Sequence, residues 1–318
     1  MTTKVLITGG AGFIGQNLSI YMRDSDLDFV VVDRSRKNVD SLIEQFGNDE
    51  DIFCMDTSDA LEWIEDGRFD VVIHLSAVPR VPYSIEHPVE TTKENIVKTV
   101  ELLDACVKGK VKRFVFASSS SVYGNSEILP VTEDLPLNPI SPYALQKKTA
   151  EDFCSLYSTL YDLDTVCLRF FTVYGPLQTG DNPYATVICA WLDAVKNKTE
   201  LKLFGDGSQL RDFNYIDDVV NALILSALTD DCYGQVFNLG SPDHYSLIDF
   251  VSILHNITGV DYVLVPFPED KKLIDIGDYY GDYSKFSDIT GWHPYTNLNK
   301  GLELSISFFR AHSQKYIT

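Results

Sequence analysis

The first chemically informative feature of the chain is a tyrosine and a lysine four residues apart. Tyr143 and Lys147 follow Ser141 and Pro142, a capping residue and a first-turn proline that together predict the start of a helix. Residues at this spacing project from one helix face, so the phenol and the ammonium are expected to share a pocket. A nearby ammonium favours the phenolate and lowers the pKa of a tyrosine from its usual value of about 10. The spacing therefore predicts that Tyr143 accepts a proton, although it also fits a surface lysine beside an aromatic ring.

A glycine-rich turn at the N-terminus predicts a dinucleotide site. The segment KVLITGGAGFIG runs from an apolar strand through Gly9, Gly12 and Gly15 into a helical pattern. In such a turn the glycines leave room for phosphates at the start of the helix, whose N–H groups bind the pyrophosphate.

The second apolar strand carries an acid that bears on the choice of cofactor. It reads FVVVD and ends at Asp33, where a carboxylate can accept hydrogen bonds from an adenosine ribose. This favours NAD over NADP. Arg34 and Arg36 follow Asp33 and would suit the 2′-phosphate of NADP, so the sequence alone leaves that alternative open.

The conjunction resembles the extended short-chain dehydrogenase/reductase family, in particular its NAD-dependent nucleotide-sugar epimerases and dehydratases. The matching segments span nearly the whole chain: GGAGFIG (9–15), HLSA (74–77), ASSSSVYG (117–124), SPYALQK (141–147), LRFFTVYGP (168–176), FGDGSQLRDFNYIDD (204–218), VFNLGS (236–241) and DYSK to GW (282–292). The resemblance implies that Ser119 binds the reacting sugar oxygen and that Tyr143 is the acid/base. It implies that Lys147 holds the nicotinamide ribose and tunes the tyrosine.

The resemblance also widens the expected cofactor site. Its residues are the glycines Gly9, Gly12 and Gly15, together with Phe13, Ile14, Asp33, Asp56, Asn95, Tyr143 and Lys147. The expected cofactor is NAD.

Expected substrate contacts also follow from the resemblance, with Ser119 among them. Arg211, in GDGSQLRDF, corresponds to an arginine that grips the substrate pyrophosphate, although an exposed loop arginine is the plain alternative. Lys272 stands where the family often has a second arginine, which keeps the charge and loses bidentate geometry. Thr172 replaces an asparagine that is usual in the family and resembles the uronate 4-epimerase branch.

A pocket residue is also expected near the DYSK motif. Tyr279 aligns with the position where a large side chain crowds the C2 substituent of the sugar and a small one leaves space for an N-acetyl group. Tyr280 and Tyr283 lie close by, so a one-residue shift or plain packing of the lobe are alternatives. The tyrosine favours UDP-glucose, UDP-galactose or the corresponding uronates.

The predicted function is that of a nucleotide-sugar 4-epimerase with tightly held NAD. Tyr143 would remove the proton of the C4 hydroxyl while C4 passes hydride to the cofactor, and the 4-keto sugar would turn over and take the hydride back. A 4,6-dehydratase or a C4-oxidising decarboxylase is the enzymatic alternative. Ser120 and Ser121 stand where many dehydratases carry an Asp-Glu pair, which disfavours water elimination. A non-catalytic NAD-binding regulator would not need Ser119, Tyr143 and Lys147 together.

Composition agrees with such an enzyme. The chain has 318 residues, 45% of them hydrophobic, and a formal net charge of −20, which argues against nucleic acid or an anionic membrane as a partner. The acidity also fits mere solubility. Six cysteines occur without a CxxC pair and read as reduced core residues, and no metal site is expected. No leader or long apolar run is present, so a cytoplasmic enzyme is predicted.

The predicted fold class is α/β, a Rossmann-type doubly wound parallel sheet with a smaller C-terminal substrate-binding lobe. Strand-like runs at 4–8, 28–33, 51–55, 69–75, 112–118 and 164–170 alternate with helical patterns. We expect an NAD-binding domain over 1–175, with returning segments near 210–240 that include VFNLG. Residues 176–318 mainly form the lobe that binds the substrate, with a helix near 186–197.

One helix also predicts an interface. The helix from Tyr143 carries the stripe Phe153, Leu156, Tyr157, Leu160 and Tyr161. In the family this helix and one near 89–107 form a four-helix homodimer contact, whereas the periodicity alone fits packing on the sheet equally well.

Overall fold

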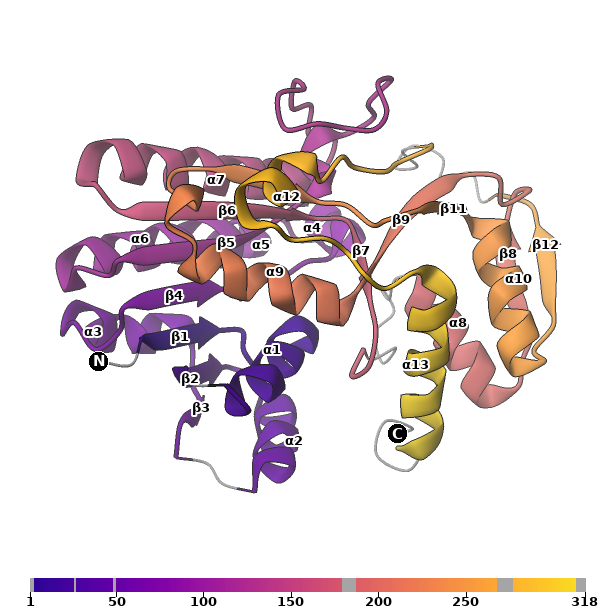
Figure 1. The fold of residues 1–318 in the computed structure, drawn as a ribbon, viewed down its shortest axis with the longest axis horizontal. Coiled ribbons are helices and arrows are strands. Elements are labelled where there is room, and N and C mark those ends of the chain that lie inside the picture. Colours follow the sequence, from indigo (N-terminus) through magenta and orange to yellow (C-terminus); the bar gives the residue numbers. More distant parts are fainter. Residues whose placement is uncertain (1–2, 26, 48–49, 179–186, 268–276, 313–318) are drawn as a thin grey trace.

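The large sheet has the predicted Rossmann-type order. The computed structural model describes residues 3–25, 27–47, 50–178, 187–267 and 277–312. Its seven-stranded sheet has the order β10-β6-β5-β4-β1-β2-β3, and every neighbouring pair is parallel (Figure 1). The strands are β1 (Lys4–Thr8), β2 (Asp28–Asp33), β3 (Ile52–Cys54), β4 (Val71–His74), β5 (Arg113–Ser119), β6 (Asp164–Phe170) and β10 (Val236–Leu239). The six strand-like runs and the return of VFNLG to the sheet are thus confirmed.

Helices cover both faces of this sheet because its strands are apolar on both sides. In β1, Val5 and Ile7 face one core cluster, while Leu6 between them faces the other. The first cluster includes side chains of α1 (Phe13–Arg23), α2 (Arg36–Phe46) and α9 (Ile216–Leu228). The second includes side chains of α3 (Leu61–Glu65), α6 (Lys98–Gly109) and α7 (Pro142–Tyr161). The carboxyl ends of the strands, where glycines and polar residues gather, stay uncovered by these helices.

A second group of elements lies to one side of the large sheet (Figure 1). It contains a three-stranded sheet of β11 (His244–Ser246), β9 (Leu210–Tyr215) and β7 (Thr172–Tyr174), and a two-stranded sheet of β12 (Tyr262–Val265) and β8 (Leu201–Phe204). Its helices are α8 (Val187–Asn197), α10 (Leu247–Thr258) and α13 (Leu298–Ala311). The division of the chain at residue 175 stays a prediction.

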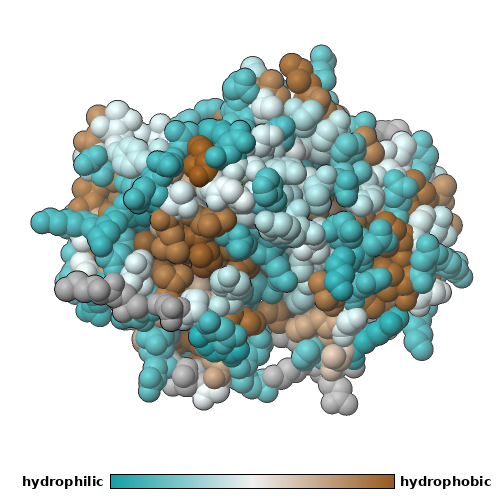
Figure 2. All heavy atoms as spheres, in the orientation of Figure 1, coloured by the Kyte–Doolittle hydropathy of each residue, from teal (hydrophilic) through white to brown (hydrophobic). Residues whose placement is uncertain are grey.

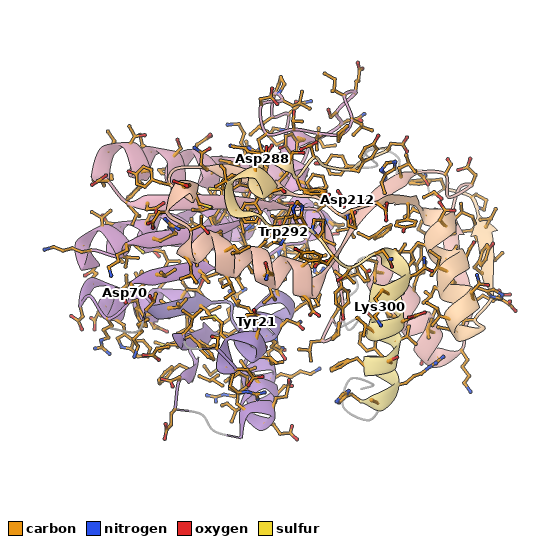
Figure 3. The ribbon with its side chains drawn as sticks, viewed as in Figure 1. Tyr21, Asp70, Asp212, Asp288, Trp292 and Lys300 are labelled. Carbon is orange, nitrogen blue, oxygen red and sulfur yellow. The ribbon has the colours of Figure 1, made fainter. Side chains whose placement is uncertain are left out.

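Asp212 joins strands near the meeting point of these two groups of elements (Figure 3). Its carboxylate accepts hydrogen bonds from the backbone N–H groups of Ser241 at 2.6 Å and Gly281 at 3.0 Å. Burial raises the pKa of Asp212 to about 6, and these N–H donors act in the opposite direction. The short helix α12 (Ser284–Thr290) follows, and the indole of Trp292 donates to the carbonyl of Asp218 in α9 at 3.0 Å. This hydrogen bond ties the C-terminal segment to α9, one of the helices that cover the large sheet.

The surface is mostly hydrophilic on the face drawn in Figure 2, with a hydrophobic patch over α9 and a second hydrophobic area at the right of the view. Leu228 at the end of α9 is 47% exposed. Among the helices that the structure describes, none combines the length and apolarity needed to cross a membrane.

Candidate active site

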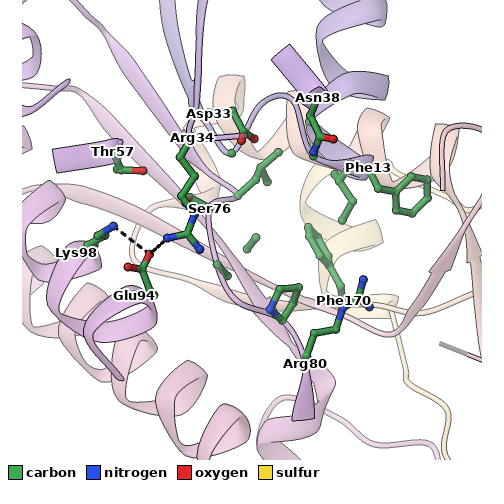
Figure 4. A pocket seen from close by; sticks show the side chains of 18 of the residues that line it. Phe13, Asp33, Arg34, Asn38, Thr57, Ser76, Arg80, Glu94, Lys98 and Phe170 are labelled. Carbon is green, nitrogen blue, oxygen red and sulfur yellow. Dashed lines mark hydrogen bonds and ion pairs between the residues drawn. The ribbon is translucent and has the colours of Figure 1, made fainter. Parts of the chain in front are cut away.

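A cleft of about 490 Å³ opens at the carboxyl ends of the central strands (Figure 4). It brings together most of the residues that the sequence predicts for a cofactor site: Gly9, Gly12, Phe13, Ile14, Gly15, Asp33, Asp56, Tyr143 and Lys147. These residues come from the turn after β1, the ends of β2 and β3, and the first turns of α7. A cleft at this edge of a parallel sheet is where such folds bind their ligands.

The glycine turn leaves its backbone accessible to an anion. Gly9 has φ +69°, and a Cβ there would lie 2.7 Å from the backbone of Ser76. A Cβ on Gly15 would lie 2.5 Å from the Cα of Gly10, so only glycine permits the close contact of turn and helix. Gly12 is the N-cap of α1 and supplies no side-chain cap, which leaves N–H groups of the first turn for a ligand. The turn therefore fits a dinucleotide pyrophosphate.

Asp33 ends β2 with its carboxylate in the cleft. Its oxygens accept hydrogen bonds from the N–H groups of Ala11 at 3.2 Å and Ser35 at 2.9 Å. Burial raises the pKa of Asp33, while these bonds and the charge of Arg34 lower it. Arg34 itself pairs with Glu94 at 2.7 Å, so its guanidinium is already held by an acid.

Asp56 and Asn95 play different parts. Asp56 lines the cleft, and burial would raise its pKa, but its hydrogen bond and ion pair with Lys98 at 2.7 Å lower the pKa overall. Asn95 is buried in a π-helical turn (η2, Lys93–Val97) and lies outside the cleft lining. Its amide accepts from the N–H of Val78 at 2.8 Å and donates to Gln146 at 2.8 Å. Its contact with a cofactor stays a prediction.

The helix α7 positions the tyrosine and the lysine as the sequence predicts. The hydroxyl of Ser141 caps α7 by accepting the N–H of Ala144 at 3.1 Å. The N–H of Tyr143 donates to the hydroxyl of Ser84 at 3.1 Å. This serine belongs to α4 (Val81–Glu86), so the first turn of α7 is fixed against a neighbouring helix. Tyr143 and Lys147 are 8% and 3% exposed.

The predicted effect of Lys147 on the tyrosine is wrong for this chain taken by itself. The ammonium of Lys147 lies 6.0 Å from the centre of the Tyr143 ring and donates to the carbonyl of Ala117 at 2.6 Å. Burial raises the pKa of Tyr143 to about 12, with Ser119 and Arg80 acting in the opposite direction. Burial also lowers the pKa of Lys147 to about 8. Desolvation thus dominates the pKa of Tyr143, and the groups that oppose it are Ser119 and Arg80 and not the lysine.

Ser119 is the last residue of β5 and is half-buried beside Tyr143. Its hydroxyl accepts the N–H of Ser121 at 3.2 Å and caps the short helix η3 (Ser120–Tyr123). The hydroxyl of Ser118 donates to the buried carboxylate of Glu151. Ser118 is among the residues that line the cleft and Ser119 is not, but it is the side chain of Ser119 that bonds the phenol of Tyr143.

Comparisons with known proteins agree with this geometry. The description "NAD dependent epimerase/dehydratase family" matches residues 5–240. The chain belongs to this family. A UDP-glucose 4-epimerase of Mycolicibacterium smegmatis is 31% identical over 98% of this chain and 100% of that protein. A UDP-N-acetyl-alpha-D-glucosaminuronate decarboxylase of Bacillus cytotoxicus is 31% identical, with 98% of each chain covered.

Solved structures extend the likeness to the fold. A UDP-glucuronic acid 4-epimerase from Bacillus cereus, in complex with UDP-glucuronic acid and NAD, has a TM-score of 0.86 and 30% identity. The match covers 97% of this chain and 99% of that one. The Rossmann-type architecture and the membership of the epimerase/dehydratase family are therefore established for this chain.

Apart from Ser119, the expected substrate residues that the structure describes lie in or beside the second group of elements. Thr172 is half-buried in β7, and Tyr279 is 5% exposed in a cluster with Phe171. The guanidinium of Arg211 in β9 donates to the carbonyl groups of Leu210 and Gly277. None of these three lines the cleft described above, and Lys272 falls outside the described residues. Their substrate contacts stay predictions.

The sequence analysis did not predict several residues that line the cleft of this protein. They include Asn38, Thr57, Ser76, Arg80, Phe170 and Gln178. Ser76 lies inside the HLSA segment, so the family motif contains a signal for it. Arg80 stands in an irregular loop, where no periodic pattern indicates which way a side chain points.

Proposed function

We propose that the protein is an NAD-dependent UDP-sugar 4-epimerase. The observation that carries the proposal is the meeting of Tyr143 and Lys147 with a glycine turn in one cleft, with the side chain of Ser119 hydrogen-bonded to Tyr143. Family membership and relatives named as UDP-glucose and UDP-glucuronic acid 4-epimerases support it.

Each residue of the trio has a distinct task in this proposal. Tyr143 takes the proton of the C4 hydroxyl and returns it to the same oxygen when C4 is reduced on its other face. Ser119 binds the same sugar oxygen and holds it against the phenol. Lys147 fixes the end of β5 by donating a hydrogen bond to the carbonyl of Ala117, and its positive charge lies 6.0 Å from the centre of the Tyr143 ring.

The cofactor proposed for this cleft is NAD. Gly12 and the first turn of α1 would hold its pyrophosphate, and Asp33 its adenosine ribose. When bound, NAD would supply the acceptor for the hydride of C4 and the donor for its return. The NADP alternative loses support because Arg34 is paired with Glu94 and Arg36 lies 3.6 Å from Asp40, outside the cleft lining.

The other reactions of the family remain as alternatives within the same redox chemistry. A relative named as a decarboxylase is as similar as the epimerases, so C4-oxidising decarboxylation is the second candidate. The 4,6-dehydratase reading is weaker because Ser120 is buried and its carbonyl accepts a hydrogen bond from Tyr279. A serine there offers no acid or base for elimination of water.

A homodimer is part of the proposal. In α7, Leu156, Leu160 and Tyr161 are 46%, 62% and 53% exposed, whereas Phe153 and Tyr157 pack onto the core. The stripe predicted from the sequence therefore splits between core and surface, and its outer half is an apolar surface suited to a second copy of the chain.

We also propose that the enzyme works in the cytoplasm. The thiols of Cys106, Cys154, Cys167 and Cys232 are buried and free among the described residues, as expected in a reducing compartment.

The experiment that tests the proposed function is product analysis by NMR with UDP-glucose, UDP-glucuronate and UDP-N-acetylglucosamine. We expect the C4 epimer of at least one sugar, and Tyr143→Phe should lower kcat by about 10²- to 10⁴-fold while NAD stays bound. A 4-keto-6-deoxy or decarboxylated product from the wild type would assign the chain to another reaction. Turnover of Tyr143→Phe within threefold of wild type would remove the tyrosine from the mechanism.

A further inference from the structure

Four cationic side chains of the described part of the chain line the cleft, and Arg80 differs from the other three, which are Arg34, Lys98 and Lys147. Arg34 and Lys98 form ion pairs with Glu94 at 2.7 and 3.0 Å, and the ammonium of Lys147 is hydrogen-bonded to a backbone carbonyl. Among the described residues, no side chain or carbonyl engages the guanidinium of Arg80. The cleft thus holds a half-buried guanidinium that is available to a ligand.

The backbone of Arg80 is fixed relative to the catalytic tyrosine. Arg80 is the N-cap of α4, and its carbonyl accepts the N–H of Ser84 at 2.9 Å. The hydroxyl of the same serine accepts the N–H of Tyr143 at 3.1 Å. Before Arg80, the loop is clamped where Asn95 binds both the N–H and the carbonyl of Val78, at 2.8 and 3.2 Å. These bonds hold the base of the arginine side chain in register with the phenol.

Arg80 lies at the end of the cleft opposite to Asp33. Figure 4 shows it beside Phe170 and far from Asp33, the residue proposed for the adenosine ribose. Its charge reaches the phenol of Tyr143 and favours the phenolate. The link through Ser84 and this effect of the charge together place a group bound by the guanidinium near Tyr143.

We propose that Arg80 binds the C6 carboxylate of a UDP-hexuronate, which makes uronates the preferred substrate class of this enzyme. The proposal rests on the 4-epimerase function above. The C4 hydroxyl belongs at Tyr143, and the C6 carboxylate hangs from the adjacent carbon C5. The other anionic group of the substrate, the glycosyl phosphate, is attached at C1 across the ring and points away from the tyrosine.

The chemistry of the side chain suits this ligand. A guanidinium presents two parallel N–H donors that match the two oxygens of a carboxylate, and such charge-assisted pairs are among the strong hydrogen bonds of proteins. The chain carries a net charge of −20, so a further negative charge on the sugar needs a local cation. A neutral hexose would leave Arg80 without a partner in the cleft, which disfavours it relative to the uronate.

The test compares kcat/KM for UDP-glucuronate and UDP-glucose in the NAD-bound wild type, Arg80→Met and Arg80→Lys. We expect the wild type to prefer UDP-glucuronate and Arg80→Met to lower the ratio of the two constants by about 10- to 100-fold. Arg80→Lys should keep part of the preference. Arg68→Met is the matched control, because Arg68 pairs with Asp66 outside the cleft and should leave the ratio unchanged.

The ratio separates carboxylate binding from a general effect on Tyr143. If Arg80→Met lowers kcat/KM equally for both sugars, or leaves kcat/KM unchanged for both, the proposal is overturned. Calorimetric binding of both nucleotide sugars to Tyr143→Phe and to Tyr143→Phe/Arg80→Met gives a readout without turnover. A uronate preference that disappears only in the double variant supports the site even if the reaction is not epimerisation, whereas equal binding of both sugars by Tyr143→Phe overturns it.

Discussion

Lys147 donates a hydrogen bond of 2.6 Å to the carbonyl oxygen of Ala117, on the strand that ends at Ser119. The lysine thus connects the helix that carries Tyr143 to the strand that carries Ser119. Its ammonium also lies 4.6 Å from the centre of the Phe116 ring. The ammonium thus holds the strand and the helix together. It also lowers the stability of the fold, because it is buried without an ion pair among the described residues.

This cost predicts a pH-dependent stability. Burial lowers the pKa of Lys147 from 10.5 to about 8 in the folded chain, so the unfolded chain binds more protons between these two values. The penalty is present below pH 8 and is relieved as pH rises towards 10.5. The free energy of unfolding of the wild type, minus that of Lys147→Met, should therefore rise by up to about 3 kcal/mol from pH 7 to 10.

Urea unfolding of the cofactor-free protein at several pH values measures this difference. Lys148→Met is the control, because Lys148 is the next residue, is partly exposed and pairs with Asp152 at 2.7 Å. Its difference from wild type should not change with pH over this range. A flat difference for Lys147→Met would mean that the buried amine keeps an ordinary pKa.

Cofactor preference is the second prediction. Titrations should give a lower Kd for NAD than for NADP, because the carboxylate of Asp33 repels a 2′-phosphate and accepts from a 2′-hydroxyl. Asp33→Asn should reduce the preference for NAD, measured as the Kd for NADP divided by the Kd for NAD, by about tenfold or more. This factor corresponds to the loss of one charge-assisted hydrogen bond. Asp40→Asn is the control, since it pairs with Arg36 outside the cleft. Tighter binding of NADP by the wild type would show that Arg34 leaves Glu94 to take the phosphate.

A buried ion pair behind the site gives the third prediction. Arg169 in β6 donates to both oxygens of Glu151 in α7, at 3.0 and 2.7 Å, and both side chains are almost fully buried. Glu151→Ala leaves the guanidinium buried and unpaired and should lower the free energy of unfolding by about 3–5 kcal/mol. Asp152→Ala, the next residue, breaks only the exposed pair with Lys148 and should cost less than about 1 kcal/mol. Equal effects of the two variants in urea unfolding would contradict the structural role of the pair.

The sequence predicts the sheet and the catalytic helix well for a physical reason. Apolar strands such as VVIH bury every position, and Ser141 with Pro142 marks a helix start by local bonding alone. The fate of charges is not local. Whether Lys147 meets Tyr143 or the Ala117 carbonyl depends on a strand brought alongside only by folding, and the same holds for Glu151 and its partner in β6. Arg80 was missed because its loop is oriented by distant side chains such as Asn95.

Substrate width is the last prediction. Tyr279 stacks on Phe171 with ring centres 5.3 Å apart, and its hydroxyl donates to the carbonyl of Ser120, next to Ser119. If this ring limits the space at C2, the wild type should use UDP-N-acetylglucosamine at least tenfold less efficiently than UDP-glucose, and Tyr279→Ser should narrow that gap.

Two further variants make the test of Tyr279 decisive. Tyr279→Phe keeps the ring and loses only the hydroxyl, so it should preserve the selectivity of the wild type in kcat/KM. Tyr280 stacks on His244 with ring centres 4.2 Å apart, and Tyr280→Ser should also leave selectivity unchanged. If the difference in kcat/KM between the two sugars narrows in Tyr280→Ser and not in Tyr279→Ser, the residue that limits the space at C2 is Tyr280. Efficient use of the N-acetylated sugar by the wild type would disprove the gate and leave the 4-epimerase proposal standing, because C4 chemistry depends on Tyr143 and not on the space at C2.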